Sequence, residues 1–367
     1  MKLIIIAAIL PLLISCHHER LLTVSPTNKA IGHYGRTAFD QNNDIVLIGS
    51  ASYVEFSFSG DSCRVFLKNI APGPDDYNYV SIEVDNRYQG RRKVIERVRT
   101  AFTIKATSIN SSHLVRIYKA TEPHNGVVVF AGAQGRDITA AEHPAKKKIE
   151  FIGNSITAAM AADLTDIPCG QGKWYDQHNA YYSYASRTAR AVGADFLISA
   201  VSGIGIYRNW NSLAPTMPQV YESAYLEIDS TQRWDFSQYT PDVVSICLGT
   251  NDFSDGDGKS PRLPFDSATY TNTYIKFIGT IYQHYPNAQI VLLTSPMLNG
   301  PKGPLMLTCL ERVQGRCRDV YAGKKGIQIF RFQPMEPKGC SYHPDLKDHE
   351  VMAKQLEPFL RRILDNL

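Results

Sequence analysis

Several features that identify nucleic-acid-binding, metal-binding and nucleotide-binding proteins are missing from this chain. No block of lysine or arginine exceeds three residues, as in Lys-Lys-Lys at 146–148, and the net charge is only +4 over 367 residues. Nucleic-acid binding therefore gains no support. The sequence has no Cys-x-x-Cys pair, no His/Cys cluster at zinc spacing, no P-loop, no dinucleotide fingerprint and no complete Gly-x-Ser-x-Gly motif. We expect no metal and no cofactor.

Long hydrophobic runs are absent except at the amino terminus. Lys2 precedes an apolar run at 3–14 that is too short to cross a bilayer but suits a signal peptide. The run ends in Leu-Ile-Ser-Cys, which resembles the bacterial lipobox, in which the cysteine becomes the lipidated first residue of the mature protein. Residues 1–16 are therefore expected to be a lipoprotein signal peptide, with Cys16 anchoring the protein to a membrane of the bacterial cell envelope. The alternative is an ordinary cleaved signal with a chance cysteine.

Cysteine is scarce in the remainder of the chain. The six cysteines beyond Cys16 are too few for a disulfide scaffold but are compatible with an oxidising envelope. Cys309 and Cys317 fall in one expected helix, 305–321, where eight residues separate them by roughly 12 Å. They cannot pair with each other. One of them could reach Cys340, and we state that bond as a hypothesis that a thiol count by mass spectrometry would test. Cys247 lies in an apolar strand and is expected to be a small core residue.

The remaining composition, 44% hydrophobic and 20% charged, supports two globular units. From about 43 to 135 the pattern is short strands with no helix between them, and 53–58 alternates at period two. This predicts an antiparallel β-sandwich of jelly-roll type at 28–143, with a structural or accessory role. After a linker at 140–148, strands alternate with helices, which predicts a three-layer α/β/α domain with a parallel sheet at 147–367. Its expected strands are 149–152, 196–201, 243–248, 290–294 and 327–330.

Unusual loops follow three of these strands. They read Gly-Asn-Ser-Ile-Thr at 153–157, Val-Ser-Gly-Ile-Gly at 201–205 and Leu-Gly-Thr-Asn-Asp at 248–252. A fourth segment, Tyr-His-Pro-Asp-Leu-Lys-Asp-His at 342–349, precedes the last helix. Because the carboxyl ends of parallel strands share one edge, where open α/β sheets bind ligands, all four segments should meet there. From its own segment alone, Ser155 has about equal odds of being a helix cap and of being a reactive group.

These segments contain the parts that ester hydrolysis requires, namely a nucleophile, a base and donors to the oxyanion. Ser155 can attack, and a histidine near the last helix can take its proton. The Ser155 N–H, the Gly203 N–H and the Asn251 side-chain amide can form the oxyanion hole. Glycine at 203 allows its N–H to approach the substrate closely.

In this order, Ser155, Gly203, Asn251 and His343 resemble the four blocks of the SGNH (GDSL-like) hydrolase superfamily. Nearly everything from about residue 28 onward is similar to carbohydrate esterase family 2, including 179–184, 188–190, 202–205 and 208–210. Members join an amino-terminal jelly roll to an SGNH domain and remove acetyl groups from plant polysaccharides such as xylan and glucomannan. The resemblance implies a carbohydrate O-acetyl esterase that works through an acyl-enzyme on an acetylated polysaccharide, without a metal.

Two histidines compete for the role of base. The resemblance selects His343, which precedes proline, whereas His349 at the start of the final helix is expected to be a structural residue. Most SGNH enzymes carry an aspartate two or three residues before the catalytic histidine, but this chain has Cys340 and Ser341 there. Three alternatives account for the missing aspartate. A backbone carbonyl can accept the His343 Nδ1–H, an acid elsewhere such as Glu336 can replace the aspartate, or the protein can be a weak catalyst. The first is our prediction and gives a Ser–His dyad.

Substrate contacts are expected from Trp210 and Tyr207, which follow the second block, and with less support from Trp174. An aromatic ring can stack on a pyranose, but each of these residues can equally be a packing residue. Asp345 is expected to face the start of the final helix, and Asp252 to bond nearby backbone in a turn. The rival functions are an SGNH lipase or thioesterase acting on other small esters, and a non-catalytic glycan-binding lipoprotein.

Overall fold

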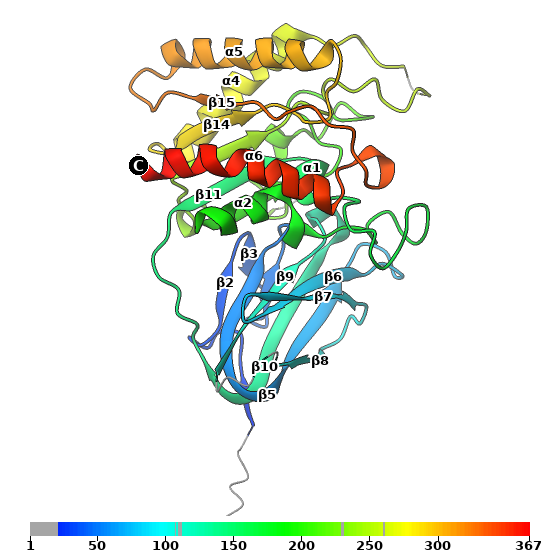
Figure 1. Ribbon diagram of the computed structural model, residues 1–367, viewed down its shortest axis with the longest axis vertical. Helices are drawn as coiled ribbons and strands as arrows, with labels where there is room; N and C mark the ends of the chain where they lie inside the picture. The colour runs from blue at the N-terminus through cyan, green and yellow to red at the C-terminus, as the bar shows by residue number, and fades with distance from the viewer. Residues whose placement is uncertain (1–20, 107, 109–111, 229–230, 260) are drawn as a thin grey trace, which may run out of the picture.

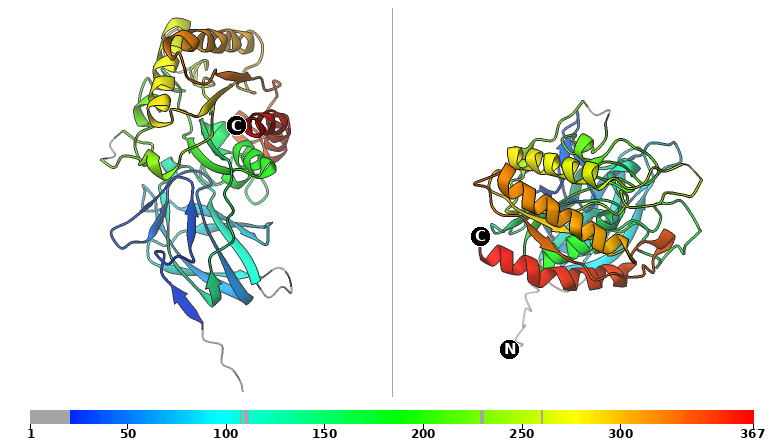
Figure 2. Two further views of the ribbon diagram at one scale, coloured as in Figure 1. Left: turned by 90° about the vertical axis from the view of Figure 1, so that its left-hand side faces the viewer. Right: turned by 90° about the horizontal axis from the view of Figure 1, so that it is seen from above.

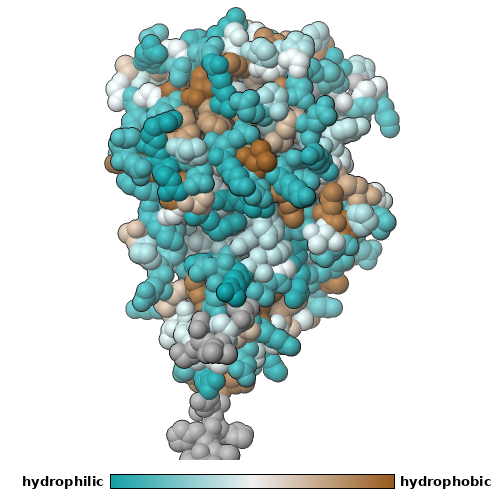
Figure 3. All heavy atoms as spheres, in the orientation of Figure 1, coloured by the Kyte–Doolittle hydropathy of each residue, from teal (hydrophilic) through white to brown (hydrophobic). Residues whose placement is uncertain are grey.

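The structure is a computed structural model that describes residues 21–106, 108, 112–228, 231–259 and 261–367. The expected signal peptide and Cys16 lie outside the described residues. An antiparallel sheet domain is stacked end to end with an α/β domain (Figure 1). No helix in the described ranges has the length and apolar character needed to span a bilayer. The face in Figure 3 is mostly hydrophilic, and its hydrophobic residues form small separate patches.

The amino-terminal domain is an antiparallel sheet that folds over one apolar core. Its two longest strands, β5 and β10, pair with each other, and register shifts interrupt β10. Such irregularities bend a strand and allow a single sheet to enclose a core. Side chains such as Phe56, Val115 and Phe130 fill that core. The strands are β1 (Leu22–Val24), β2 (Gly32–Tyr34), β3 (Thr37–Phe39), β4 (Ile45–Leu47), β5 (Tyr53–Ile70), β6 (Asn78–Val84), β7 (Arg87–Val94), β8 (Thr100–Lys105), β9 (Ser112–Lys119) and β10 (Val127–Thr139).

The carboxy-terminal domain has the predicted three layers. Its parallel sheet has the strand order β12-β11-β13-β14-β15. Helices α2 and α6 pack on one face, and α4 and α5 on the other (Figure 2). The strands are β11 (Lys148–Gly153), β12 (Asp195–Ala200), β13 (Val243–Cys247), β14 (Gln289–Leu293) and β15 (Gln328–Phe330). The helices are α1 (Ser155–Ala158), α2 (Tyr184–Val192), α3 (Met217–Val220), α4 (Ser267–His284), α5 (Lys302–Val320) and α6 (Leu346–Asp365), with short 3-10 turns η1 (Pro123–Asn125), η2 (Ala180–Tyr182), η3 (Phe236–Gln238) and η4 (Cys340–Tyr342).

The two domains share buried surface. Tyr53 and Tyr118 of the first domain join the same apolar cluster as Phe196 of the second. Polar pairs also cross the boundary: the Tyr181 hydroxyl donates to Glu83 over 2.7 Å, and Arg91 Nη1 donates to the His178 carbonyl over 2.7 Å. Buried polar groups require such partners. The amino-terminal domain is therefore docked firmly beside the loops that follow β11 and β12.

Candidate active site

The register of the parallel sheet brings the three sequence blocks to one edge. Gly153 at the end of β11 pairs with Ala200 of β12 on one side and with Cys247 of β13 on the other. The loops that begin at 154, 201 and 248 consequently leave the sheet side by side. The Val201 N–H also contacts the Gly153 carbonyl at 3.4 Å, which holds the first two loops together.

The hydrogen bonds around Ser155 show which residue caps α1. The cap of α1 is Asn154, whose side chain accepts a hydrogen bond from the Ile156 N–H at 3.1 Å. Ser155 is the first helical residue, and its hydroxyl is directed instead to His343, with 2.8 Å between Ser155 Oγ and His343 Nε2. This is the distance expected for a nucleophile bonded to its base.

A backbone carbonyl holds the other ring nitrogen of His343. The Nδ1 atom lies 2.8 Å from the Ser341 carbonyl oxygen, which leaves Nε2 free to accept the serine proton. The predicted carbonyl is therefore present. Among the described residues no carboxylate contacts the ring, and Glu336 is exposed. Burial lowers the pKa of His343, so the neutral imidazole required of a base is favoured.

The turn before His343 adopts an unusual backbone conformation. Ser341 and Tyr342 have φ angles of 52° and 58°, in the left-handed region that costs non-glycine residues roughly 1–2 kcal/mol each. This conformation aims the Ser341 carbonyl back at the ring. Two backbone hydrogen bonds close the turn, from the His343 N–H to the Cys340 carbonyl at 3.0 Å and from the Gly339 N–H to the His343 carbonyl at 2.7 Å.

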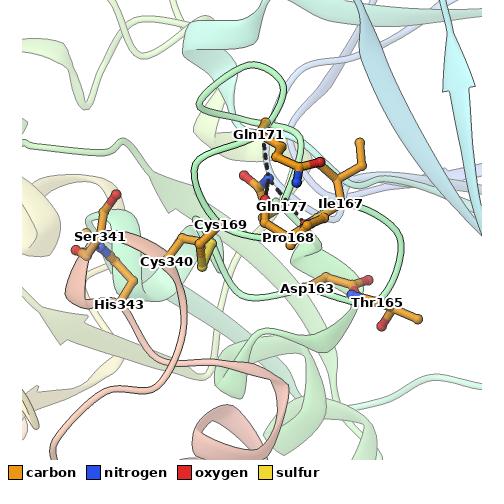
Figure 4. Close-up of a disulfide and its surroundings, with 10 residues drawn as sticks. All are labelled: Asp163, Thr165, Ile167, Pro168, Cys169, Gln171, Gln177, Cys340, Ser341 and His343. Atoms are coloured by element: carbon orange, nitrogen blue, oxygen red, sulfur yellow. Dashed lines mark hydrogen bonds between the residues drawn. A yellow bond between two sulfur atoms is a disulfide. The ribbon is translucent and has the colours of Figure 1, made fainter.

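A disulfide between Cys169 and Cys340 fastens this turn to the long loop that follows α1 (Figure 4). The expected bond from Cys309 or Cys317 to Cys340 is wrong. Both of those cysteines are free and buried in the core between α5 and the sheet, whereas Cys340 is bonded to Cys169. Cys247 is a buried core residue, as predicted. The loop around Cys169 is itself ordered by Gln177, which donates to the carbonyls of Ile167, Pro168 and Gln171.

The predicted oxyanion donors lie at the same edge. Gly203 has a φ of +78°, a conformation that favours glycine, and a Cβ there would meet open space. Among the described residues no hydrogen-bond acceptor contacts the N–H of Ser155 or of Gly203. Asn251 donates from Nδ2 to the Ile204 carbonyl at 2.8 Å, which ties the third loop to the second and leaves the second amide proton available.

Asp252 supports the loop after Gly203. Its buried carboxylate accepts hydrogen bonds from the backbone N–H groups of Ile206, Tyr207 and Arg208, at 2.8 to 3.3 Å. The predicted backbone-bonding role is therefore present, although its partners lie in the second loop. Burial raises the pKa of Asp252 to about 6. Arg262, which sequence reasoning missed, donates to the Asn251 carbonyl at 2.6 Å and fixes that residue from behind.

Asp345 and His349 both have structural contacts at the start of the last helix. Asp345 caps α6 by accepting from the N–H groups of Lys347 and Asp348, as predicted. His349 is fully buried, and its Nδ1 accepts from the Tyr184 N–H at 3.1 Å. Burial lowers the pKa of His349 to about 3. These contacts assign His349 to packing rather than to the site.

One cavity adjoins the site at Gly203, and a second cavity shares the side chain of His124 with it. One of about 430 Å³ is lined by Gly203, Trp210 and His124, and another of about 220 Å³ by Trp174, Lys173 and His124. Trp210 and Trp174 are about half exposed, at 47% and 48%. His124 comes from the first domain and borders both cavities. Tyr207 lies elsewhere, packed against Phe265 with its hydroxyl accepting from the Asp266 N–H, so its substrate role stays a prediction.

Comparison with known proteins agrees with this architecture. Residues 151–350 match the GDSL-like lipase/acylhydrolase family, and residues 33–144 match the carbohydrate esterase 2 N-terminal domain. The cellulase/esterase CelE of Acetivibrio thermocellus is 31% identical over 91% of the chain, which spans only 39% of that relative's length. An acetylxylan esterase/glucomannan deacetylase of Cellvibrio japonicus is 26% identical over 94% of the chain and 89% of its own length.

A solved structure extends the comparison to three dimensions. A family two carbohydrate esterase from Clostridium thermocellum, in complex with cellohexaose, superposes with a TM-score of 0.80 at 29% identity, covering 92% of this chain and 100% of that one. The chain therefore belongs to the GDSL-like lipase/acylhydrolase family of carboxylic ester hydrolases and, by its amino-terminal domain and its relatives, to carbohydrate esterase family 2. The fold class and the family predicted from the sequence are confirmed.

Proposed function

We propose that this protein is a carbohydrate O-acetyl esterase that removes acetyl groups from plant cell-wall polysaccharides such as xylan and glucomannan through a Ser–His dyad. The observation that carries the proposal is the continuous path from Ser155 Oγ to His343 Nε2 and from His343 Nδ1 to the Ser341 carbonyl, at 2.8 Å for each step. The names of the relatives, which include acetylxylan esterase/glucomannan deacetylase, support the substrate class.

In the proposed reaction Ser155 Oγ attacks the acetyl carbonyl carbon while His343 Nε2 takes the hydroxyl proton. The Ser341 carbonyl accepts from Nδ1–H and keeps the ring in the tautomer whose Nε2 is a base. The oxyanion faces the N–H groups of Ser155 and Gly203 and the amide of Asn251. His343 returns the proton to the departing sugar oxygen, and a water molecule then hydrolyses the acetyl-serine by the same steps in reverse order.

The cavity beside Gly203 and the cavity next to it at His124 support a saccharide substrate. Trp210 and Trp174 each offer an exposed ring to one cavity, and His124 lies between the two cavities. An exposed ring with polar neighbours suits the stacking of a pyranose, whereas an acyl chain requires a longer apolar groove. This observation favours the esterase over a lipase or thioesterase.

A substrate series tests the proposal. We expect hydrolysis of p-nitrophenyl acetate, little cleavage of longer p-nitrophenyl esters, and acetate release from acetylated xylan or glucomannan, with acetylated pectin as a third substrate. Ser155→Ala should abolish all of these activities. Preference for longer esters would favour the lipase or thioesterase. Polysaccharide binding without acetate release from any substrate would favour the glycan-binding protein.

Lipid anchoring through Cys16 in the bacterial cell envelope belongs to the same proposal and is supported by the lipobox-like Leu-Ile-Ser-Cys sequence. Labelling with radioactive palmitate in a bacterial host should mark the wild-type protein in the membrane fraction. Cys16→Ala should remove the label and release the protein. Unlabelled, released wild-type protein would indicate an ordinary signal peptide.

A further inference from the structure

Glu122 is a buried carboxylate that the amino-terminal domain places against the loop of the candidate oxyanion donor. It follows β9, and its side chain is fully buried. One carboxylate oxygen accepts from the Ser202 N–H at 3.1 Å and also from the Ser202 hydroxyl. Ser202 belongs to the other domain and immediately precedes Gly203. A carboxylate of one domain thus fixes the residue next to an active-site glycine of the other.

This contact completes the support of Gly203. On its far side, the Gly203 carbonyl accepts from the Trp210 N–H at 2.9 Å. Gly203 itself lacks a side chain that could restrain it, and its left-handed backbone is held by its neighbours alone. With Ser202 bonded to Glu122 and the Gly203 carbonyl bonded to Trp210, the peptide that carries the Gly203 N–H has a fixed direction.

The surroundings of Glu122 are unusual for a residue that only joins two domains. Lys119 is also buried, and its Nζ donates to the carbonyls of Thr121 and Glu122 at 3.0 and 2.7 Å. Burial lowers the pKa of Lys119 to about 7 and raises that of Glu122. His178 Nε2 lies 3.9 Å from the carboxylate, and His124 Nδ1 lies 3.7 Å from it. A buried acid is costly unless it is well bonded, and Ser202 supplies two of the bonds.

We propose that Glu122 is a positioning residue for the oxyanion hole, so that the amino-terminal domain contributes directly to turnover. The inference rests on the proposed esterase function. Loss of the Glu122 contacts lets the 201–203 loop relax and turns the Gly203 N–H away from the developing oxyanion. Because the oxyanion exists only in the transition state, kcat falls while KM stays nearly constant.

Glu122→Ala and Glu122→Gln test the proposal with p-nitrophenyl acetate and its thiono analogue, in which sulfur replaces the carbonyl oxygen. Sulfur accepts hydrogen bonds poorly, so the ratio of kcat/KM for the oxygen ester to that for the thiono ester reports the alignment of the donors. A partly unfolded sample lowers kcat/KM for the oxygen ester and for the thiono ester by the same factor, so the ratio does not change. We expect Glu122→Ala to lower kcat and this ratio by about tenfold or more, and Glu122→Gln, which keeps one acceptor, to lie between Glu122→Ala and the wild type.

Glu83→Gln is the matched control, because Glu83 is a buried carboxylate at the same domain boundary that contacts Tyr181 and Arg116 instead of the loop. Its ratio should equal that of the wild type. Should Glu122→Ala fail to fold, Ser202→Ala removes the hydroxyl bond from the other side and should lower the ratio several-fold. An unchanged ratio in the folded Glu122 or Ser202 variants, with an active wild type, overturns the positioning role alone. An inactive wild type overturns the proposed function.

Discussion

The two ends of the proton path in this protein are held by different means. Ser155 stands at the end of β11, a central strand of the parallel sheet, and its backbone is fixed by strand pairing and by the Asn154 cap. His343 stands in an irregular turn with two left-handed residues, held by the Cys169–Cys340 disulfide and a few hydrogen bonds. The proposed nucleophile therefore takes its position from the fold, whereas the proposed base is positioned by local contacts.

The difference shows how the site can dispense with the usual acid. An aspartate orients a histidine by charge and geometry together. Here the Ser341 carbonyl supplies the geometry without the charge, and the disulfide one residue earlier keeps that carbonyl in place. In the proposed dyad, the imidazolium that forms during attack would be stabilised by the dipole of this carbonyl. We therefore expect the position of His343 to be more easily disturbed by substitution than the position of Ser155.

Removal of the Ser155 or the His343 side chain should have the largest effect on kcat. Ser155→Ala and His343→Ala should each reduce kcat by at least about ten-thousand-fold, because nucleophile and base act as one unit. The double variant should be no worse than either single variant. Steady-state hydrolysis of p-nitrophenyl acetate measures this. A His343→Ala enzyme with more than a hundredth of wild-type kcat would show that another group takes the proton.

Asn251→Ala should reduce kcat by about a hundred- to a thousand-fold through the loss of one oxyanion donor. The matched control is Asn272→Ala, which removes an exposed amide on α4 that accepts a hydrogen bond from Arg316 and should leave kcat unchanged. Equal kcat in the two variants would exclude Asn251 from the oxyanion hole.

Cys169→Ala should disturb the position of His343 without affecting Ser155. A displacement of His343 by about 1 Å would lower kcat up to about a hundred-fold, and the lost cross-link would cost roughly 2–5 kcal/mol of stability. Kinetics and denaturant unfolding measure the two effects. Cys309→Ala is the control, because Cys309 is free and buried outside the site. Unchanged kcat in Cys169→Ala would mean that the hydrogen bonds of the turn suffice to hold His343.

Acidification should inactivate the enzyme through His343. Burial lowers the pKa of this base, so kcat/KM should stay constant down to a midpoint below 6.5 and then fall about tenfold per pH unit. Stability should decrease over the same range, because His349 has a folded pKa of about 3 and the unfolded chain takes up its proton from about pH 6.5 downward. A profile of kcat/KM against pH and thermal unfolding at each pH separate the two effects. A midpoint above 6.5 would require an acid beside His343.

Glu336→Gln should have the smallest effect, within about twofold in kcat, because this exposed side chain does not touch His343. Activity assays with the purified, folded variant decide this. Loss of turnover would assign Glu336 as the missing acid and overturn the dyad.

Sequence reasoning predicted what is local or periodic. The parallel strands, the serine after a strand and the histidine before the final helix each follow from short patterns. The lack of an acid at 340 and 341 leaves three alternatives for His343, and the family resemblance favours the backbone carbonyl. The Cys169–Cys340 bond joins residues 171 positions apart, and the Glu122–Ser202 contact crosses two domains. No local pattern encodes such pairings, because the first arises from how two loops of the second domain meet and the second from how the two domains dock.

The shared apolar cluster at the domain boundary has a consequence for how this family can change. Tyr53 and Tyr118 pack with Phe196 across the boundary, and Glu83 and Arg91 bond residues of the second domain. The amino-terminal domain therefore depends on matching residues in the second domain and cannot be exchanged freely. A recombinant chimera that exchanges it between relatives must carry the matching boundary residues with it, and substitutions on the two sides are expected to be inherited together.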